Sequence, residues 1–515
     1  MAWIVIGEEK GRIKLVSKSG VDAILPKGSY LTVENGASRF ILRVDDSAQD
    51  EPYAPSPMIV DMDLTGLIQD QKCQNIIFAN RVKDVTSRTD GMIDFIPPQA
   101  TARRSNQEEI DMAIGAETAG PRVFVATVHG GQNQLLIDDN RNFITTRLPI
   151  DMFYHQTLIC GKTGSGKTVS TKYLAQYFTE ELEGAVLAIN VKDIDFLMMN
   201  FPSTGRHEQV RKEWGVLGKK AHGIDNYVIY YPANTSVEEY RTIDQGVCKK
   251  ITLDVKTIEP EALTGLLQGI SDVGAQSFPN IFRYWQQRVM KEGGTFGDFV
   301  SYFIKGEDDN RVFQTLNSRE DISEIPLHKG TYDNILRTIS VAIDFFDNKG
   351  AKTLSAKDIL VKGKMSVINV TGNKGIQFGS IMLRHLLHKI VEAKSQQELD
   401  VPILIIIDEV HQFYNSNSSL EALGDLDTIC RTGRNKKIGV IFSSQSPSDI
   451  PRGLASVINT KIFFKSDAAT AKSFGVNVSS DEMESLKKGF AVANIHDLSQ
   501  LKILKFPLAY AGVIE

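Results

Sequence analysis

Eight consecutive residues offer the most specific chemistry in the sequence. They fit the spacing G-x-x-x-x-G-K-[ST] and stand between an apolar strand-like run and an amphipathic helical pattern. Glycines at such positions let backbone N–H groups turn toward phosphate oxygens, with a helix N-terminus behind them. Lys167 is placed to supply positive charge at the β- and γ-phosphates of ATP, and Thr168 to offer a hydroxyl to Mg²⁺. The predicted nucleotide contacts are Gly161, Lys162, Thr163, Gly164, Ser165, Gly166, Lys167 and Thr168.

Two carboxylates end another apolar run. Residues 402–407 read Pro-Ile-Leu-Ile-Ile-Ile, as in a central parallel strand, and Asp408 and Glu409 follow. Ligands bind at this C-terminal tip in open α/β sheets. Asp408 suits a magnesium ligand acting through water, and Glu409 suits a general base that polarises the attacking water. The alternative is an ordinary strand end before a helix N-cap, and the pairing with the glycine-rich loop favours the catalytic interpretation.

A third candidate strand, residues 438–443, is followed by Ser444 and Gln445. The Gln445 amide is a candidate for sensing the γ-phosphate or orienting the water, although a polar residue at a strand tip is often only part of a turn. Upstream, the stretch from Arg431 to Lys437 concentrates four positive charges in seven residues. It is either a solvated helix end, where cations suit the helix dipole, or an arginine finger that reaches a neighbouring subunit's nucleotide.

Different segments of the sequence show different secondary-structure patterns, and these patterns indicate the elements that position the candidate residues. From residue 157 onward, strand-like runs alternate with amphipathic helical runs, a pattern typical of an α/β fold with a parallel sheet covered on both faces. Residues 1–120 contain short apolar runs between Gly, Pro, Asn and Asp, which predict a small β-barrel or sandwich. The polar stretch 101–111 has the composition of a linker out of that domain. Residues 202–356 are mostly helical in pattern and predict an insertion.

Composition bounds the class of protein. A chain of 515 residues predicts two to four domains, and 42% hydrophobic with 23% charged residues is ordinary for a globular enzyme. The net charge of −5 restricts any nucleic-acid contact to local basic loops. Without a signal-type N-terminus or an apolar run of about 20 residues, we expect a cytoplasmic protein without membrane segments. The four cysteines lack metal-ligand spacing and are expected to be buried thiols: Cys73, Cys160, Cys248 and Cys430.

Taken together, four motifs resemble those of the HerA branch of the HerA/FtsK superfamily, which are ring-forming DNA-translocating ATPases. The motifs are Gly161 to Thr168, Asp408-Glu409-Val410-His411, Arg431-Thr432-Gly433-Arg434, and the block from Ser444-Gln445-Ser446 to Pro451. One departure is Asn190-Val191-Lys192, where relatives often carry an acidic or histidine-containing element. It leaves no ground to expect magnesium contacts from that strand.

The resemblance implies a RecA-like P-loop ATPase core of the additional-strand type, with an N-terminal β-barrel and a mainly helical insertion. The implied boundaries are 1–120 for the barrel, 121–201 with 357–500 for the core, 202–356 for the insertion and 501–515 for a C-terminal tail. It also implies a homohexamer on double-stranded DNA, with ATP and Mg²⁺ at subunit interfaces. Arg434 is the implied trans-acting finger, and Arg431 is the second candidate.

A partner is implied as well: a nuclease of the NurA type in DNA end processing, or a sirtuin-type or other effector in antiviral defence. Two hypotheses remain open. The first is a motor that couples ATP hydrolysis to translocation or unwinding of duplex DNA, and the second is an ATP-sensing hexameric scaffold that regulates an effector enzyme. Lys374, Lys436 and Lys437 are candidate channel contacts, and His411 either couples the site to its neighbour or caps the strand exit.

Overall fold

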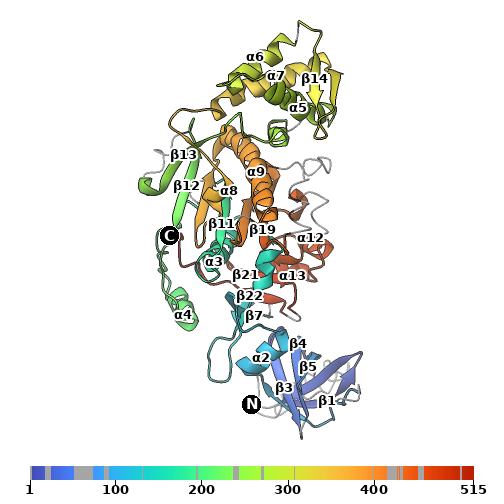
Figure 1. Cartoon of the computed structure of the whole chain (residues 1–515). Helices are drawn as coiled ribbons and strands as arrows, with labels where there is room; N and C mark the ends of the chain where they lie inside the picture. The colour runs from blue at the N-terminus through green and yellow to red at the C-terminus, as the bar shows by residue number, and fades with distance from the viewer. Residues whose placement is uncertain are drawn as a thin grey trace, which may run out of the picture. The chain divides into compact units, whose positions relative to one another are not determined.

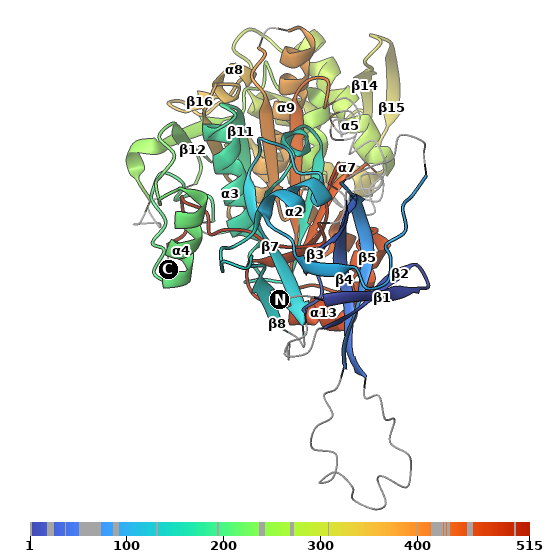
Figure 2. The ribbon, with the colours of Figure 1, turned by 90° about the horizontal axis from the view of Figure 1, so that it is seen from below.

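The computed structural model describes most of the chain as two compact units (Figures 1 and 2). One unit comprises Met1–Ile150 and Ile462–Pro507, and the other comprises Asp151–Lys461 and Leu508–Glu515. The described residues are 3–514 without 18–24, 37, 51–73, 86–91, 130–131, 193–194, 236–242, 268–271, 307, 398, 414–425, 427–428, 430–432, 451–456 and 499–500. Within these ranges, no helix is long and apolar enough to cross a lipid bilayer.

The first unit begins with a closed six-stranded barrel in the order β1-β2-β5-β4-β3-β6. Side chains alternate between its two faces, and the inward ones, such as Leu15, Val33 and Leu42, form a core without solvent exposure. The predicted barrel is therefore confirmed, although residues 51–73 of the predicted segment lie outside the described residues. The strands are β1 Trp3–Glu9, β2 Arg12–Ser17, β3 Tyr30–Asn35, β4 Ser38–Asp50, β5 Gln74–Asp84 and β6 Thr101–Arg104.

The expected linker at 101–111 is instead part of the folded barrel unit. Its first residues form β6, which pairs with both β1 and β3, and helix α2 follows. The polar residues that suggested a linker satisfy one another, because Glu109 is buried and accepts hydrogen bonds from Arg103 and from the Asn106 backbone in a capping box. Polarity alone did not distinguish solvated chain from a paired strand and a capped helix.

The rest of this unit contains short strands and helices from both ends of the chain. Strand β22 pairs with β21 and β7, so residues 503–505 belong to a sheet, although they fall in the segment expected to be a C-terminal tail. The elements are α2 Gln107–Ile114, β7 Arg122–His129, β8 Gln132–Leu135, β9 Thr145–Arg147, α12 Ala468–Ser473, α13 Ser480–Ser485, β21 Phe490–Asn494 and β22 Ile503–Lys505. Strand β20, Thr460–Phe463, and the short helix η2, Ile150–Tyr154, cross the boundary between the units.

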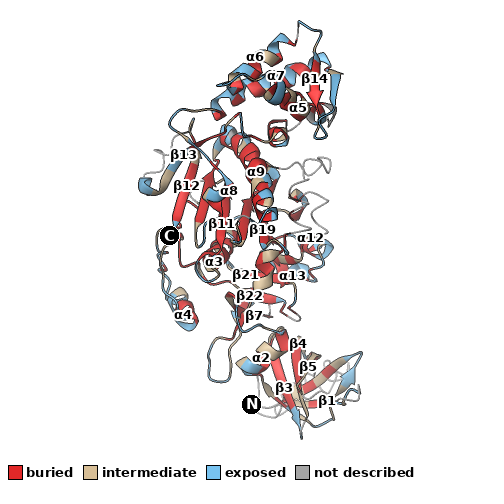
Figure 3. Cartoon of the chain, in the orientation of Figure 1, coloured by how far each residue is buried: buried red, intermediate tan, exposed pale blue. Residues whose placement is uncertain are grey.

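The second unit is built on a parallel sheet in the order β16-β13-β12-β17-β11-β18-β19-β10. Strand β19 lies between β10 and β18 and pairs in parallel with both, so the strand that precedes the glycine-rich loop is separated from the acidic strand by one additional strand. The central strands are buried on both faces, as apolar runs in parallel sheets require (Figure 3). This arrangement confirms the predicted α/β, RecA-like fold of the additional-strand type.

Two helices frame this sheet close to the candidate residues. Helix α3 packs against β10, β11 and β19, and α9 packs against β17. The apolar face expected on α3 is present, with Tyr173, Leu174 and Phe178 buried. The elements are β10 Gln156–Cys160, α3 Lys167–Glu180, β11 Ala185–Asn190, α4 Glu208–Leu217, β17 Met365–Asn369, α9 Gly372–Ser395, β18 Ile403–Asp408, η7 Val410–Gln412, β19 Ile438–Ser444 and η9 Pro447–Asp449.

Residues 202–356 are not uniformly an insertion. Strands β12 and β13 extend the central sheet beside β17, whereas the helical part that follows has its own aromatic core, in which Phe299, Phe303 and Tyr332 make ring contacts. The elements are β12 Tyr227–Pro232, η3 Gln245–Val247, β13 Cys248–Thr252, η4 Pro260–Leu266, α5 Asp272–Tyr284, η5 Trp285–Val289, α6 Phe296–Lys305, β14 Val312–Leu316, β15 Ile322–Pro326, α7 Lys329–Ala342, η6 Ile343–Phe345, β16 Lys352–Thr353 and α8 Ala356–Ile359.

The cysteines differ from their expected burial. Cys160 is buried as predicted, whereas Cys248 is only half-buried at the start of β13, on the outer part of the sheet. Cys73 and Cys430 lie outside the described residues.

Candidate functional site

The glycine-rich loop joins β10 to α3. Gly164 and Gly166 have φ of 79° and 118°, backbone conformations that side-chain-bearing residues rarely adopt, which explains the glycines at these two positions. The Ser165 hydroxyl donates to the Lys162 carbonyl at 2.7 Å and tightens the turn. Helix α3 begins at Lys167 with no side-chain cap, so its first N–H groups are available to an anion.

Lys167 is directed into this loop. Its side chain is buried, and its Nζ donates to the Gly161 carbonyl at 2.6 Å. Burial lowers the pKa of Lys167, while the nearby carboxylates of Glu409 and Asp408 act in the opposite direction. The ammonium therefore lies in the electrostatic field of the acidic strand, as expected for a group that shares a nucleotide with it. Thr168 follows in the first turn of α3 and is half-buried.

The acidic pair ends β18, in the middle of the sheet. Asp408 is 4% exposed, and burial raises its pKa to about 6, to which the neighbouring charge of Glu409 also contributes. Glu409 is 2% exposed and adopts the left-handed backbone conformation, with φ 48° and ψ 57°. A buried, non-glycine residue in that conformation is strained, and such strain is found mainly where surrounding structure holds a functional side chain in place.

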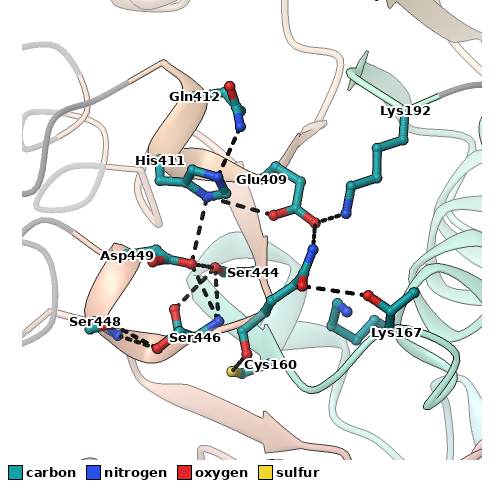
Figure 4. A network of polar contacts seen from close by, with 12 residues as sticks. Cys160, Lys167, Lys192, Glu409, His411, Gln412, Ser444, Ser446, Ser448 and Asp449 are labelled. Atoms are coloured by element: carbon teal, nitrogen blue, oxygen red, sulfur yellow. Dashed lines mark hydrogen bonds and ion pairs between the residues drawn. The ribbon is translucent and has the colours of Figure 1, made fainter.

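Three side chains surround the Glu409 carboxylate (Figure 4). Lys192 contacts Oε1 as an ion pair, and the Gln445 Nε2 donates to the same oxygen at 3.1 Å. His411 approaches from the opposite side, with its Nδ1 3.6 Å from Oε2, which has no hydrogen-bond partner. Burial favours a higher pKa for Glu409, but the contacts from Lys192 and Gln445 outweigh it, and the pKa is lowered.

Gln445 connects the loop to the acidic pair. It follows β19, and its Oε1 accepts from the Thr163 hydroxyl at 3.4 Å while its Nε2 donates to Glu409. The Cys160 thiol contacts the Gln445 carbonyl at 3.5 Å. One amide side chain thus touches both the glycine-rich loop and the candidate base.

A second network fixes the turn after β19. Asp449 accepts a hydrogen bond from the Ser444 hydroxyl and lies 3.5 Å from Nδ1 of His411. Ser446 is the N-cap residue of the short helix η9, and its hydroxyl lies 2.7 Å from the hydroxyl of Ser448 (Figure 4). The block after Ser444 therefore contacts His411, whose Nδ1 also lies 3.6 Å from Glu409.

The candidate arginine and lysines lie apart from this network. Arg434 is exposed and makes an ion pair with Asp151 at 2.9 Å, on the turn before β19. Arg431, the second finger candidate, lies outside the described residues. Each channel candidate has a partner within its own unit: Lys374 with Asp344, Lys436 with Ser395 and Lys437 with Asp400.

Sequence reasoning did not assign a role to Lys192. It was noted only as a departure from the acidic element found after this strand in relatives. The structure places it by way of Asn190, a fully buried side chain at the tip of β11, whose Nδ2 donates to Asn369 and whose Oδ1 accepts from the Phe196 backbone. These bonds fix the tip of β11, two residues before Lys192, and Lys192 contacts Glu409. The only signal in the sequence was a cation after a strand that neighbours the acidic one.

The fold and the loop together define a P-loop NTPase of the additional-strand type. No protein-family model matches the chain. Over 185 residues it is 24% identical to "DNA double-strand break repair helicase HerA" of Sulfurisphaera tokodaii, which covers 34% of this chain and 37% of that protein. The HerA of Saccharolobus solfataricus is also 24% identical, over 184 residues, covering 34% of this chain and 36% of the relative. The matched part of the chain is HerA-like, and the chain spans about a third of the length of these curated relatives.

Solved structures include similar chains with low sequence identity. VirB4 of Thermoanaerobacter pseudethanolicus aligns with a TM-score of 0.44 and 11% identity, covering 76% of this chain and 97% of that chain. The bacterial conjugative coupling protein TrwBdeltaN70 aligns with a TM-score of 0.44 and 14% identity, covering 78% of this chain and 95% of that chain.

Proposed function

We propose that this protein is an ATP-driven motor that couples ATP hydrolysis to movement along double-stranded DNA. One observation carries the proposal: the P-loop, Asp408, Glu409 and Gln445 converge at the C-terminal ends of β10, β18 and β19, with Gln445 bonded to both sides. The similarity of a third of the chain to HerA supports duplex DNA as the track.

Each residue of the site has a separate role in the proposed hydrolysis of ATP. The loop N–H groups and Lys167 hold the β- and γ-phosphates, and Glu409 accepts a proton from the attacking water. The water oxygen then bonds to the γ-phosphorus as the bond to the β–γ bridging oxygen breaks, which yields ADP and phosphate. Gln445 orients the water or the γ-phosphate, because its amide already reaches the loop and the base.

Mg²⁺ fits the residues present. Asp408 is a nearly fully buried carboxylate whose pKa is raised by burial and by its acidic neighbour. Because little solvent reaches the negative charges of this pair, a divalent cation would stabilise them. Asp408, through water, and the Thr168 hydroxyl would hold it. When bound, Mg²⁺ would neutralise charge developing on the phosphate oxygens.

The assembly part of the proposal rests on the HerA resemblance. We infer a cytoplasmic homohexamer in which Arg434 leaves Asp151 and contacts the nucleotide of the adjacent subunit. Arg431 is the second candidate for that contact. An effector, either a NurA-type nuclease in DNA processing or a sirtuin-type or other enzyme in antiviral defence, is the proposed partner.

The test is the steady-state ATPase rate of the full chain with Mg²⁺, with and without linear duplex DNA, and with Glu409→Gln as the blank. The motor predicts strong stimulation by duplex DNA and none by free nucleotides. Hydrolysis that is lost in Glu409→Gln yet indifferent to DNA would refute the motor and favour the ATP-sensing scaffold. No hydrolysis under any condition would remove the enzymatic role altogether.

A further inference from the structure

Lys192 makes a contact at the candidate base that the proposed hydrolysis does not use. Its ammonium pairs with Oε1 of Glu409, a carboxylate with only 2% of its side chain exposed. A buried carboxylate paired with an ammonium is held in one geometry, because leaving it would expose an uncompensated charge in a low-dielectric site. The ion pair therefore orients the Glu409 carboxylate.

The ion pair between Lys192 and Glu409 interferes with the role of Glu409 as a general base. A base must place one oxygen within about 2.6–3.2 Å of the proton that it accepts. Oε1 of Glu409 is already occupied by Lys192 and by the Gln445 amide, while Oε2 has no hydrogen-bond partner and faces His411. In this arrangement the carboxylate is satisfied on the side of the phosphate-binding loop, where Gln445 reaches Thr163.

Lys192 can move without losing hydration. Its side chain is 42% exposed, so water can replace the carboxylate at its ammonium. The cost of opening the pair comes from Glu409, whose buried charge then loses its cation. Asn190, two residues before Lys192, is fixed at the tip of β11 by its hydrogen bonds with Asn369 and the Phe196 backbone. Lys192 therefore extends from a fixed strand end to a buried carboxylate, an arrangement that we call a latch.

We infer that Lys192 is an inhibitory positioning residue, which holds Glu409 in a resting arrangement and must release it before each hydrolysis step. The inference rests on the proposed ATPase function and adds its regulation. Basal hydrolysis is then limited by how often the Lys192–Glu409 pair opens.

The test compares Lys192→Ala and Lys192→Arg with wild type in steady-state ATPase assays with Mg²⁺, with and without linear duplex DNA. Lys192→Ala should raise basal kcat by about two- to fivefold, the scale expected from an ion pair whose cation is partly exposed, with KM for ATP little changed. The DNA-stimulated rate should change less, so the stimulation ratio falls. Lys192→Arg, which keeps the cation, should retain a low basal kcat.

The matched control is Lys362→Ala, which removes an exposed lysine paired with Glu183 on the surface of the same unit and should leave all rates unchanged. A lower or unchanged basal kcat in Lys192→Ala would overturn the latch, and a lower value restored by Lys192→Arg would make Lys192 an activating residue instead. The two proposals fail differently: the motor fails if wild type shows no DNA stimulation, whereas the latch is judged only by the basal kcat of Lys192→Ala against wild type.

Discussion

Replacing Glu409 with glutamine tests the proposed base at one atom. The amide has the same shape, and its oxygen still accepts from Gln445, but it cannot take a proton from water. Loss of a general base costs about 10²- to 10⁴-fold in rate, which corresponds to roughly 3–5 kcal/mol of barrier. The high end is expected, because Glu409 is 2% exposed and no solvent-borne base has easy access to replace it. Lys192 loses its anionic partner but is exposed enough to be hydrated.

The assay measures phosphate release at saturating ATP and the equilibrium affinity for a fluorescent ATP analogue. Glu409→Gln should lose at least 100-fold in kcat, on the scale of a lost general base, and keep its nucleotide affinity, because the phosphate contacts come from the loop and Lys167. The control is Glu183→Gln, an exposed glutamate that pairs with Lys362. A kcat within about threefold of wild type would refute the role of Glu409, since no general-base contribution is that small.

Three further outcomes are expected. Lys167→Ala should weaken ATP binding, and an unchanged dissociation constant would contradict the P-loop assignment. Arg434→Ala should abolish turnover in pure rings yet regain it in rings mixed with Glu409→Gln subunits; full activity of the pure variant would exclude the finger. Burial lowers the pKa of Lys172 to about 8 from 10.5. The unfolded state therefore binds more protons between these values, so the unfolding free energy rises with pH, by about 2 kcal/mol from pH 7.5 to 9.5. Lys172→Met should remove that part of the rise in denaturant titrations, and equal slopes for both proteins would contradict it.

The parts of the fold that could be predicted are those written in local patterns. The apolar run at 402–407 and the loop at 161–168 each specify a strand end or a turn by residue type alone, and the structure has β18 and the β10–α3 connection there. Strands β12 and β13 were missed because their place in the sheet depends on distant strands: β12 pairs with β17 and β13 pairs with β16, each about a hundred residues or more away. The segment 101–111 was misread for the same reason, since β6 is stabilised by distant β1 and β3.

The candidate site shows the same limit at the level of side chains. Lys167, Glu409 and Gln445 were expected together because each follows a strand of one parallel sheet, and the ends of such strands meet at one edge. The ion pair of Lys192 with Glu409 joins residues 217 positions apart, on the ends of the neighbouring strands β11 and β18. No spacing rule in the sequence encodes a contact at that separation, so it appears only once the backbone is folded.

In the proposed mechanism, the contacts of Glu409 link nucleotide binding to hydrolysis, because several groups compete for one carboxylate. Gln445 is shared between Thr163 on the phosphate-binding loop and Glu409, so a phosphate that displaces the Thr163 contact also changes what Gln445 offers to Glu409. Lys192 competes for the same oxygen, and His411 stands at the other. Because a carboxylate held in a strained backbone conformation has few arrangements, loss of one partner favours a small set of others rather than free rotation. Under the proposed function, the availability of Glu409 as a base depends on which of its partners the nucleotide displaces. A motor that hydrolyses ATP in step with an external load needs such a dependence.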